Sequence, residues 1–216
     1  MSTAQVPDPV ISGSAGKATR QRGKERLDNI LKAGQSILIS EGHASLSLRR
    51  IADQLGISNG NVTYYFPNKD ALLRALIEDM LITYDREFQE EAERFPDDPE
   101  SRFRAYVDYL IADCKQADLR GFFYQLWSLA THNDVASELR EKVYEHFMRQ
   151  VLTVLEPLNP ELEQGILRCN ALTLMTLVEG LHIVYGCSET LLASVNGFDA
   201  SIRRQAQLIA TNTRAG

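Results

Sequence analysis

Cysteine is scarce in this sequence, and long apolar runs are absent from it. Only three of the 216 residues are cysteines, an odd count without a Cys-x-x-Cys pair: Cys114, Cys169 and Cys187. A disulfide framework is therefore not expected, and a reducing cytoplasm is the natural setting. No run approaches the ~18 apolar residues that cross a bilayer, and residues 1–16 lack the cationic and apolar regions of a secretory signal. We expect no contact with a membrane.

The motifs of common catalytic and metal-binding sites are missing as well. The four histidines show neither HxxxH nor HExxH spacing, and no GxSxG motif or glycine-rich phosphate loop occurs. Cys114 and His132 can still meet in space as a catalytic pair, and scattered Cys, His and Glu residues can still form a metal site. No local pattern supports either arrangement. We therefore expect a protein that is not an enzyme and that has no metal or cofactor.

Positive charge is unevenly distributed along the chain. The formal net charge is −6, which taken alone disfavours a nucleic-acid partner. Residues 17–74, however, contain ten Lys and Arg against five Asp and Glu, whereas residues 75–216 contain thirteen against twenty-three. The basic segment thus carries +5 and the acidic segment −10, with Asp8 supplying the remaining charge. A basic amino-terminal part joined to an acidic remainder predicts two functions on one chain.

Apolar residues recur at intervals of three and four along almost the whole chain, which is the period of an amphipathic helix. No period-two strand pattern persists. Gly42 and Gly56 are placed to end helices, and Ser58 and Asn68 to begin them. We predict an all-α protein with about nine helices, at residues 22–40, 47–55, 58–65, 68–94, 101–117, 121–132, 134–156, 161–186 and 188–211.

The second and third predicted helices are short, are joined by a turn that contains Gly56, and follow a longer helix. This is the layout of a helix-turn-helix unit, whose second helix enters the major groove of DNA. Val62 and Phe66, four residues apart, are predicted to face inward. The outward residues then suit contacts with base edges and phosphates: Asn59, Gly60, Asn61, Thr63 and Tyr64, with Tyr65 beside them.

Cations stand near two helix N-termini in this region. Arg49 and Arg50 lie in the first turn of the second helix, and Lys69 in the first turn of the fourth. Such cations oppose the helix dipole by ~0.3–1 kcal/mol each, but a helix N-terminus beside a cation binds phosphate well. The alternative is that these are solvated charges of a small three-helix unit, and for Arg50 the two interpretations have equal weight. For the segment as a whole we favour an anionic partner.

The stretch SLSLRRIADQLGISNGNVTYYFPNKDALLRAL, within residues 22–75, resembles the amino-terminal DNA-binding domain of TetR-family transcriptional regulators. The matching features are the Ser before Arg49, Ile51-Ala52, Gly56, the Ser58-x-Gly60 turn, Tyr64-Tyr65-Phe66, and the Asn68-Lys69 corner with Leu72. The resemblance implies DNA contacts from Ser47, Arg49, Ser58, Asn59, Gly60, Asn61, Thr63, Tyr64, Tyr65 and Lys69. The family usually has Tyr where this chain has Thr63 and often His where it has Tyr65, so a phosphate contact can pass here to Tyr64 or Tyr65.

The resemblance also implies an organisation and a function. We expect a flexible tail at residues 1–20, a helix-turn-helix DNA-binding domain at 21–68, and a helical ligand-binding and dimerisation domain at 69–216. The implied protein is a ligand-responsive repressor of the bacterial cytoplasm and nucleoid, which binds a palindromic operator in double-stranded DNA as a homodimer and is released by a small molecule. The alternative is a small-molecule-binding protein of the same fold that no longer regulates transcription. Loss of Arg49 or Lys69 would signal that alternative, and both are present.

Aromatic residues gather in the segment 122–132, which includes the only Trp of the chain. An aromatic helix with polar tips suits a largely apolar ligand pocket, although ordinary core packing explains any single residue equally well. We predict a pocket for an apolar or amphipathic effector, lined by members of the set Phe123, Trp127, Met175, Glu179 and His182.

The last two predicted helices carry more apolar surface than one chain can bury. Residues 171–178 are apolar nearly all round, which exceeds what one side of a monomer core can cover. Two such helices from each subunit can form a four-helix interface about a two-fold axis. The predicted interface residues are Leu172, Leu177, Gly180, Leu181, Phe198 and Leu208. The alternative is that both helices are buried within a single chain.

Overall fold

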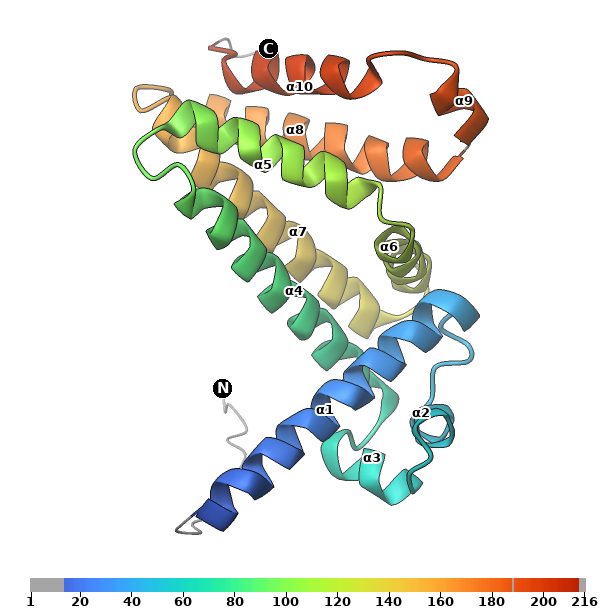
Figure 1. The fold of residues 1–216 in the computed structure, drawn as a ribbon. Coiled ribbons are helices and arrows are strands. Elements are labelled where there is room, and N and C mark those ends of the chain that lie inside the picture. Colours follow the sequence, from blue (N-terminus) through green and yellow to red (C-terminus); the bar gives the residue numbers. More distant parts are fainter. Residues whose placement is uncertain (1–13, 188, 214–216) are drawn as a thin grey trace.

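The computed structural model describes residues 14–187 and 189–213, and these residues fold into helices and short connections (Figure 1). The α-helices are α1 (Ser14–Glu41), α2 (Leu48–Leu55), α3 (Asn59–Tyr65), α4 (Lys69–Glu93), α5 (Pro99–Cys114), α6 (Ala117–Ala130), α7 (Asp134–Leu155), α8 (Gln164–Cys187), α9 (Glu189–Ala193) and α10 (Phe198–Ala210). A short 3-10 helix, Glu156–Leu158, follows α7. The described residues contain no strand, and the predicted all-α fold is confirmed.

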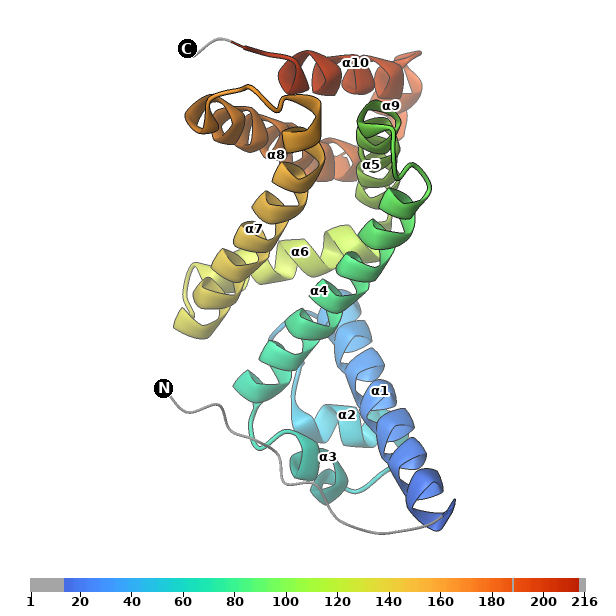
Figure 2. The same ribbon diagram turned by 90° about the vertical axis from the view of Figure 1, so that its left-hand side faces the viewer.

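Helices α1, α2 and α3 form a small unit at one end of the molecule, which we call the head (Figures 1 and 2). Its core is built from side chains that the sequence spaces along one face of each helix, and Ile30, Ile37, Ile51 and Val62 are fully buried there. The start of α4 completes this core with Leu72. The head is therefore a three-helix unit closed by the first turns of a fourth helix.

Polar caps fix where the helices of the head begin and end. Ser47, Ser58 and Asn68 each accept a hydrogen bond from the backbone N–H three residues later, at 3.1, 3.3 and 2.8 Å. Gly42 and Gly56 adopt left-handed backbone angles, with φ of 79° and 63°, where α1 and α2 end. These caps set the angle between α2 and α3, and so the face that α3 presents.

Helices α4 to α10 form the larger unit, which we call the body. The helices α4 and α7 lie side by side, α5 and α8 lie across their far ends, and α10 covers α8 (Figures 1 and 2). The head meets the body through α4 and through the contact of α1 with α6. Gly121 marks the closest part of that contact, because a Cβ there would stand 3.3 Å from Cγ2 of Ile39.

Some predicted helix boundaries were wrong. Gly121 was expected to begin a helix, but α6 starts four residues earlier and Gly121 lies inside it. A glycine is favoured at this position because α1 approaches closely, and it does not mark a helix boundary. The single helix predicted at 188–211 is divided into α9 and α10, because Gly197 takes a left-handed φ of 78°. Helix α1 begins at Ser14, so residues 14–20 of the expected tail are helical, and residues 1–13 lie outside the described part of the chain.

Candidate functional site

The outer face of α3 is polar and exposed, as predicted. Val62 and Phe66 are buried against the head's core, with 0% and 6% of their surface exposed, whereas the Tyr64 side chain is 83% exposed. Asn59, Gly60 and Asn61 are exposed as well, at the amino-terminal end of the helix. The side chains of Asn59, Asn61 and Tyr64 therefore expose hydrogen-bonding groups on a helix fixed by its own N-cap.

Two other predicted contact residues on α3 have partners within the chain. The Thr63 hydroxyl donates to the carbonyl oxygen of Gly60 at 3.2 Å. The Tyr65 hydroxyl donates to the carbonyl oxygen of Gly23 at 3.4 Å, and its ring is half-buried against the head's core. Tyr65 therefore ties α3 to α1, and of the two tyrosines Tyr64 is the accessible one.

The three cations near helix N-termini, Arg49, Arg50 and Lys69, differ in their surroundings. Arg49 is exposed. Arg50 forms a two-point ion pair with Glu41, with Nη2–Oε1 at 2.6 Å and Nε–Oε2 at 3.2 Å, which links α2 to α1. The Lys69 ammonium donates to the carbonyl oxygen of His43 at 2.6 Å, and partial burial lowers the pKa of Lys69. Of these three, Arg49 is the cation best placed to meet an external anion.

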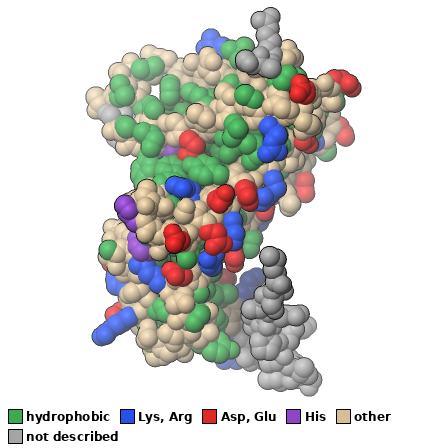
Figure 3. Space-filling model, turned by 180° about the vertical axis from the view of Figure 1, so that it is seen from behind, with side chains coloured by type: hydrophobic (Ala, Val, Ile, Leu, Met, Phe, Trp, Pro, Cys, Tyr) green, Lys and Arg blue, Asp and Glu red, His purple; other side chains and the backbone are tan. Residues whose placement is uncertain are grey.

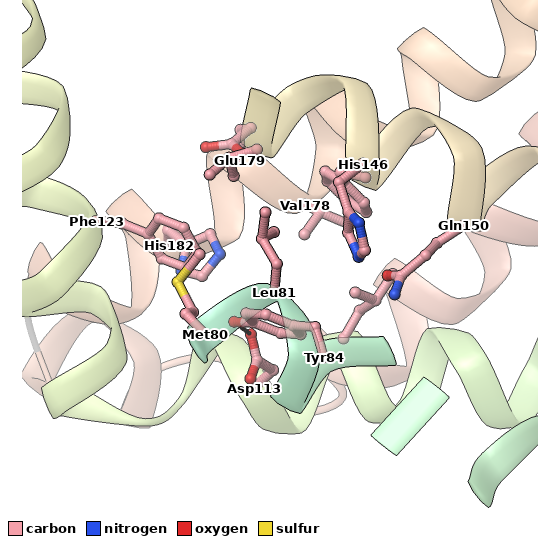
Figure 4. A pocket seen from close by; sticks show the side chains of 13 residues that line it. Met80, Leu81, Tyr84, Asp113, Phe123, His146, Gln150, Val178, Glu179 and His182 are labelled. Atoms are coloured by element: carbon pink, nitrogen blue, oxygen red, sulfur yellow. Dashed lines mark hydrogen bonds between the residues drawn. The ribbon is translucent and has the colours of Figure 1, made fainter. Parts of the chain in front are cut away.

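A narrow cavity of about 50 Å³ lies in the body between α4, α5, α6, α7 and α8 (Figure 4). Most of its walls are apolar or aromatic, and two carboxyl groups and two imidazoles interrupt them. The lining residues are Met80, Leu81, Tyr84, Leu110, Asp113, Phe123, Val143, His146, Phe147, Gln150, Val178, Glu179 and His182.

Three of the five residues predicted to line a pocket do line it: Phe123, Glu179 and His182. Trp127 lies one layer behind, stacked on Phe123 with ring centroids 5.8 Å apart. Met175 does not line the cavity and is buried in the neighbouring core formed by α5, α7, α8 and α10.

The sequence interpretation missed the contributions of α4, α5 and α7 to this cavity. Asp113 carried a usable signal, since it lies three residues after Leu110 on the apolar face of its helix, where a carboxyl group is costly. His146 and Gln150 repeat that signal on α7, as polar side chains that are almost fully buried. Met80, Leu81 and Tyr84 carried none, because they look like ordinary core residues.

The carboxyl groups of the cavity are perturbed by burial. Burial raises the pKa of Asp113 to about 7, against the opposing effect of the Tyr84 hydroxyl, which donates to Asp113 Oδ2 at 2.9 Å. Burial likewise raises the pKa of Glu179 to about 7, against the opposing effect of a hydrogen bond with Tyr144. Near neutral pH both groups therefore exchange protons readily.

His182 is neutral under the same conditions. Burial, and then the positive charge of Arg120, lower the pKa of His182 to about 4. Its Nδ1 atom is buried and has no hydrogen-bond partner within the described part of the chain. An orphaned ring nitrogen in a cavity wall is a position where a ligand can supply the missing partner.

The predicted interface residues lie on the outer side of α8 and α10, with two exceptions. Leu172 and Leu208 are 54% and 58% exposed, Gly180 is exposed and Leu177 is half-buried. Leu181 was wrongly placed, because its turn of α8 faces inward and the side chain is 2% exposed within the chain's own core. Phe198 is half-buried, with its ring against that of Tyr185.

Helix α8 is long and apolar enough to span a membrane by length and composition, and 44% of its most apolar stretch is buried within the chain. More than half of that stretch thus remains accessible. Hydrophobic side chains also reach the surface at many points on the upper part of the body (Figure 3).

Residues 30–76, which make up most of the head and the start of α4, match the model of bacterial regulatory proteins of the tetR family. The amino-terminal domain belongs to the tetR family. The predicted resemblance is thereby confirmed. Over 92 residues the chain is 30% identical to the HTH-type transcriptional regulator EthR of Mycolicibacterium smegmatis, an alignment that covers 43% of this chain and 42% of that protein. Alignments with the curated relatives span 42 to 67% of those relatives' lengths.

Solved structures share the fold over most of the chain. A transcriptional regulator from Pseudomonas aeruginosa superposes with a TM-score of 0.70 at 17% identity, covering 87% of this chain and 89% of that one. A regulator from Saccharomonospora viridis, solved in complex with choline, superposes with a TM-score of 0.62 at 18% identity, covering 88% and 97%. The curated relatives EthR and BetI are HTH-type transcriptional regulators and not enzymes, and the likeness to the solved structures shows the shared fold.

Proposed function

We propose that this chain is a ligand-responsive transcriptional repressor that binds a palindromic DNA operator as a homodimer. DNA binding is assigned to residues 21–68, and ligand binding and dimerisation to residues 69–216. The observation that carries the proposal is the exposed polar face of α3, held by a capped turn in the part of the chain that has a net charge of +5. An accessible helix on a basic domain is what major-groove recognition requires.

The residues of the head divide into two roles under this proposal. Asn59, Asn61 and Tyr64 are accessible and suit base edges, and Gly60 allows close approach of the backbone. Ser47 and Ser58 are the N-caps of α2 and α3 and suit phosphates, as do the Thr63 hydroxyl in the second half of α3 and exposed Arg49.

Lys69 and Tyr65 hold the shape of the head. The Lys69 ammonium has three N–H donors, so it can contact a phosphate while it keeps its hydrogen bond to His43. Tyr65 can reach DNA only by giving up its contact with Gly23.

Dimerisation is assigned to the outer faces of α8 and α10. Leu172, Ile183 and Leu208 are each at least half exposed on these helices. A two-fold axis beside α8 would bury them against their own copies and would set two α3 helices on one side of the dimer. An obligate interface of this kind typically buries at least ~2,000 Å².

The effector is assigned to the cavity of the body. Its volume of about 50 Å³ is well below the ~300–1,000 Å³ of typical ligand pockets, so a ligand must push its walls apart. The wall formed by Met80, Leu81 and Tyr84 belongs to α4, whose first residue is Lys69 in the head. Displacing α4 would therefore move the head and change the separation of the two α3 helices, which is allosteric if ligand affinity differs between the two arrangements.

The test is selection of bound fragments from genomic DNA, followed by affinity measurements at several salt concentrations. Affinity for the selected palindrome should fall with salt by a log–log slope of ~0.9 per phosphate neutralised. Asn61→Ala should cost ~1–3 kcal/mol on that site, and Arg49→Ala should weaken binding to all sequences. Asn196→Ala and Arg86→Ala change exposed residues of the same types in the body and serve as controls.

Weak binding to every fragment, without sequence preference, would remove the repressor proposal and favour a small-molecule-binding protein that does not regulate transcription. If the proposal holds, the protein works in the bacterial cytoplasm in association with the nucleoid. Activation in place of repression would appear as a loss of transcription from the operator's promoter when the gene is deleted.

A further inference from the structure

The ionisable side chains that line the cavity include acids but no Lys or Arg. Its thirteen lining residues include the carboxyl groups of Asp113 and Glu179 and no Lys or Arg. Within the described part of the chain neither carboxyl group forms an ion pair, since their hydrogen-bonding partners are the tyrosine hydroxyls of Tyr84 and Tyr144. Two acidic groups have therefore been buried without a compensating cation, an arrangement that costs stability in any folded protein.

Charged groups of both signs lie beside the lining residue His146, since Arg149 Nη2 is 3.5 Å from its Nδ1 atom. Asp85 is exposed, and its Oδ1 atom lies 3.1 Å from His146 Nε2 and 3.3 Å from Gln150 Nε2, both on lining residues. Arg149 and Asp85 therefore offset one another beside His146, and the acidic character of the cavity comes from Asp113 and Glu179, which favour cations over anions.

The apolar and aromatic walls of the cavity favour an organic cation over a metal ion. Phe123, Phe147 and Tyr84 offer aromatic surface, and the other contacts are mostly aliphatic (Figure 4). Such walls suit the apolar part of an organic ammonium ion, whose charge is also attracted to aromatic faces. A metal ion needs more oxygen or nitrogen ligands than this, and the described residues contain no group of three or more His, Cys, Asp or Glu that could hold one.

A third polar atom points to the same ligand chemistry. The Nδ1 atom of His182, a residue with 5% of its surface exposed, is buried beside the cavity without a partner. A neutral imidazole with an unprotonated ring nitrogen accepts a hydrogen bond. A primary or secondary ammonium group carries two or three N–H donors, so it can donate to this nitrogen and also to a carboxylate.

We propose that the effector of this protein is an organic ammonium ion with an apolar body, whose charge is bound in the cavity that Asp113, Glu179 and His182 line. This inference rests on the proposed function only in naming the cavity as the effector site. It narrows the expected apolar or amphipathic ligand to a cationic one.

The groups that surround these carboxyls set the expected pH dependence. Tyr84 and Glu87 act on Asp113, Tyr144 acts on Glu179, and Arg120 acts on His182. A cation binds the ionised carboxylates, so its affinity should rise with pH as both groups lose their protons and level off above the range in which they titrate. A neutral ligand would show no such rise.

The test uses three probes of one chain length on the full-length protein: hexylammonium, hexan-1-ol and hexanoate. Binding is followed by calorimetry and by the fluorescence of Trp127, which stacks on the wall residue Phe123. At pH 8 hexylammonium should bind at least about tenfold more tightly than hexan-1-ol, and hexanoate more weakly than both. Equal binding of the alcohol and the ammonium ion, preference for hexanoate, or no binding of hexylammonium at millimolar concentration would overturn the inference.

Variants separate the charge from the fold. Glu179→Gln and Asp113→Asn should each weaken hexylammonium binding about tenfold or more and change hexan-1-ol binding less than about twofold. Glu141→Gln, at an exposed position of α7, is the matched control and should change neither. If a variant keeps its helical circular dichroism but loses affinity for hexylammonium and hexan-1-ol equally, the carboxyl groups only shape the cavity and the inference is wrong.

Operator binding is measured separately, without probe. Cation selectivity in the cavity together with absence of operator binding would refute the repressor proposal and leave the ligand assignment standing. Operator binding together with a preference for hexan-1-ol or hexanoate would refute the ligand assignment and leave the repressor proposal standing.

Discussion

Replacing Asp113 by asparagine should stabilise the folded chain at alkaline pH. The Asp113 side chain is almost fully buried, and that burial raises its pKa to about 7. In the unfolded chain an aspartate has a pKa of about 3.9. The folded state therefore holds a proton that the unfolded state has lost between these two values, and stability falls as pH rises through this window. The cost is absent below the lower pKa and complete above the upper one.

The size of the effect follows from the two pKa values. A difference of about three pKa units corresponds to at most ~4 kcal/mol, at 1.36 kcal/mol for each unit. Local relaxation and water entry reduce such penalties, and the amide introduced by Asp113→Asn needs a partner of its own at ~1 kcal/mol. Asparagine keeps the oxygen that accepts from Tyr84. We expect a net gain of ~1–3 kcal/mol at pH 8 and a much smaller one at pH 5.

Urea unfolding at pH 5 and pH 8 measures this gain, with circular dichroism as the signal and a fixed protomer concentration because a dimer's stability depends on it. Asp79→Asn is the control, since Asp79 is exposed on α4. If Asp113→Asn is no more stable than the wild type at pH 8, with an unchanged urea dependence, the ionised carboxyl group must be stabilised by contacts other than the hydrogen bond from Tyr84.

Three further predictions concern the links between the parts. Gln125→Ala removes the acceptor of the His43 N–H and should reduce the effect of bound hexylammonium on operator affinity by about 2–10-fold; Gln89→Ala, at an exposed position near the end of α4, should not. Leu208→Arg should produce a monomer in sedimentation equilibrium that no longer binds the two-half-site operator, and a dimeric variant would contradict the proposed interface. Tyr65→Phe should cost under about 1 kcal/mol of stability and change operator affinity less than threefold by titration, whereas a larger loss would show that its hydroxyl contacts DNA.

The head was largely predictable from sequence because its signals are local. The residues that cap its helices, Ser58 and Asn68, act on backbone groups three positions away, and Gly56 ends α2 through its own φ angle. The inward residues Val62 and Phe66 follow from helical spacing alone. None of these features depends on how distant parts of the chain meet.

The cavity was only partly predictable because it depends on contacts between distant segments. Leu81 and Tyr84 of the cavity wall belong to α4, where their helical spacing does not distinguish a cavity wall from ordinary core. Trp127, the most conspicuous aromatic residue, lies behind the cavity. Leu181 shows the same difficulty on α8, where nearly every position is apolar and the inward and outward faces cannot be told apart by hydrophobicity. Which of these side chains face inward depends on where the neighbouring helices pack, and the local sequence does not determine that packing.

Two connections join the cavity to the head, and the same ligand would touch both. Helix α4 is 25 residues long, about 37 Å at 1.5 Å for each residue, and it carries wall residues near its middle and Lys69 at its start. Helix α6 carries the wall residue Phe123 and, two positions later, Gln125, which accepts from the His43 N–H at 3.3 Å. The His43 carbonyl in turn accepts from Lys69. A ligand that separates α4 from α6 therefore acts on both sides of the hydrogen bond between His43 and Lys69, and this loop is where a change in the cavity would be expected to alter the position of the head.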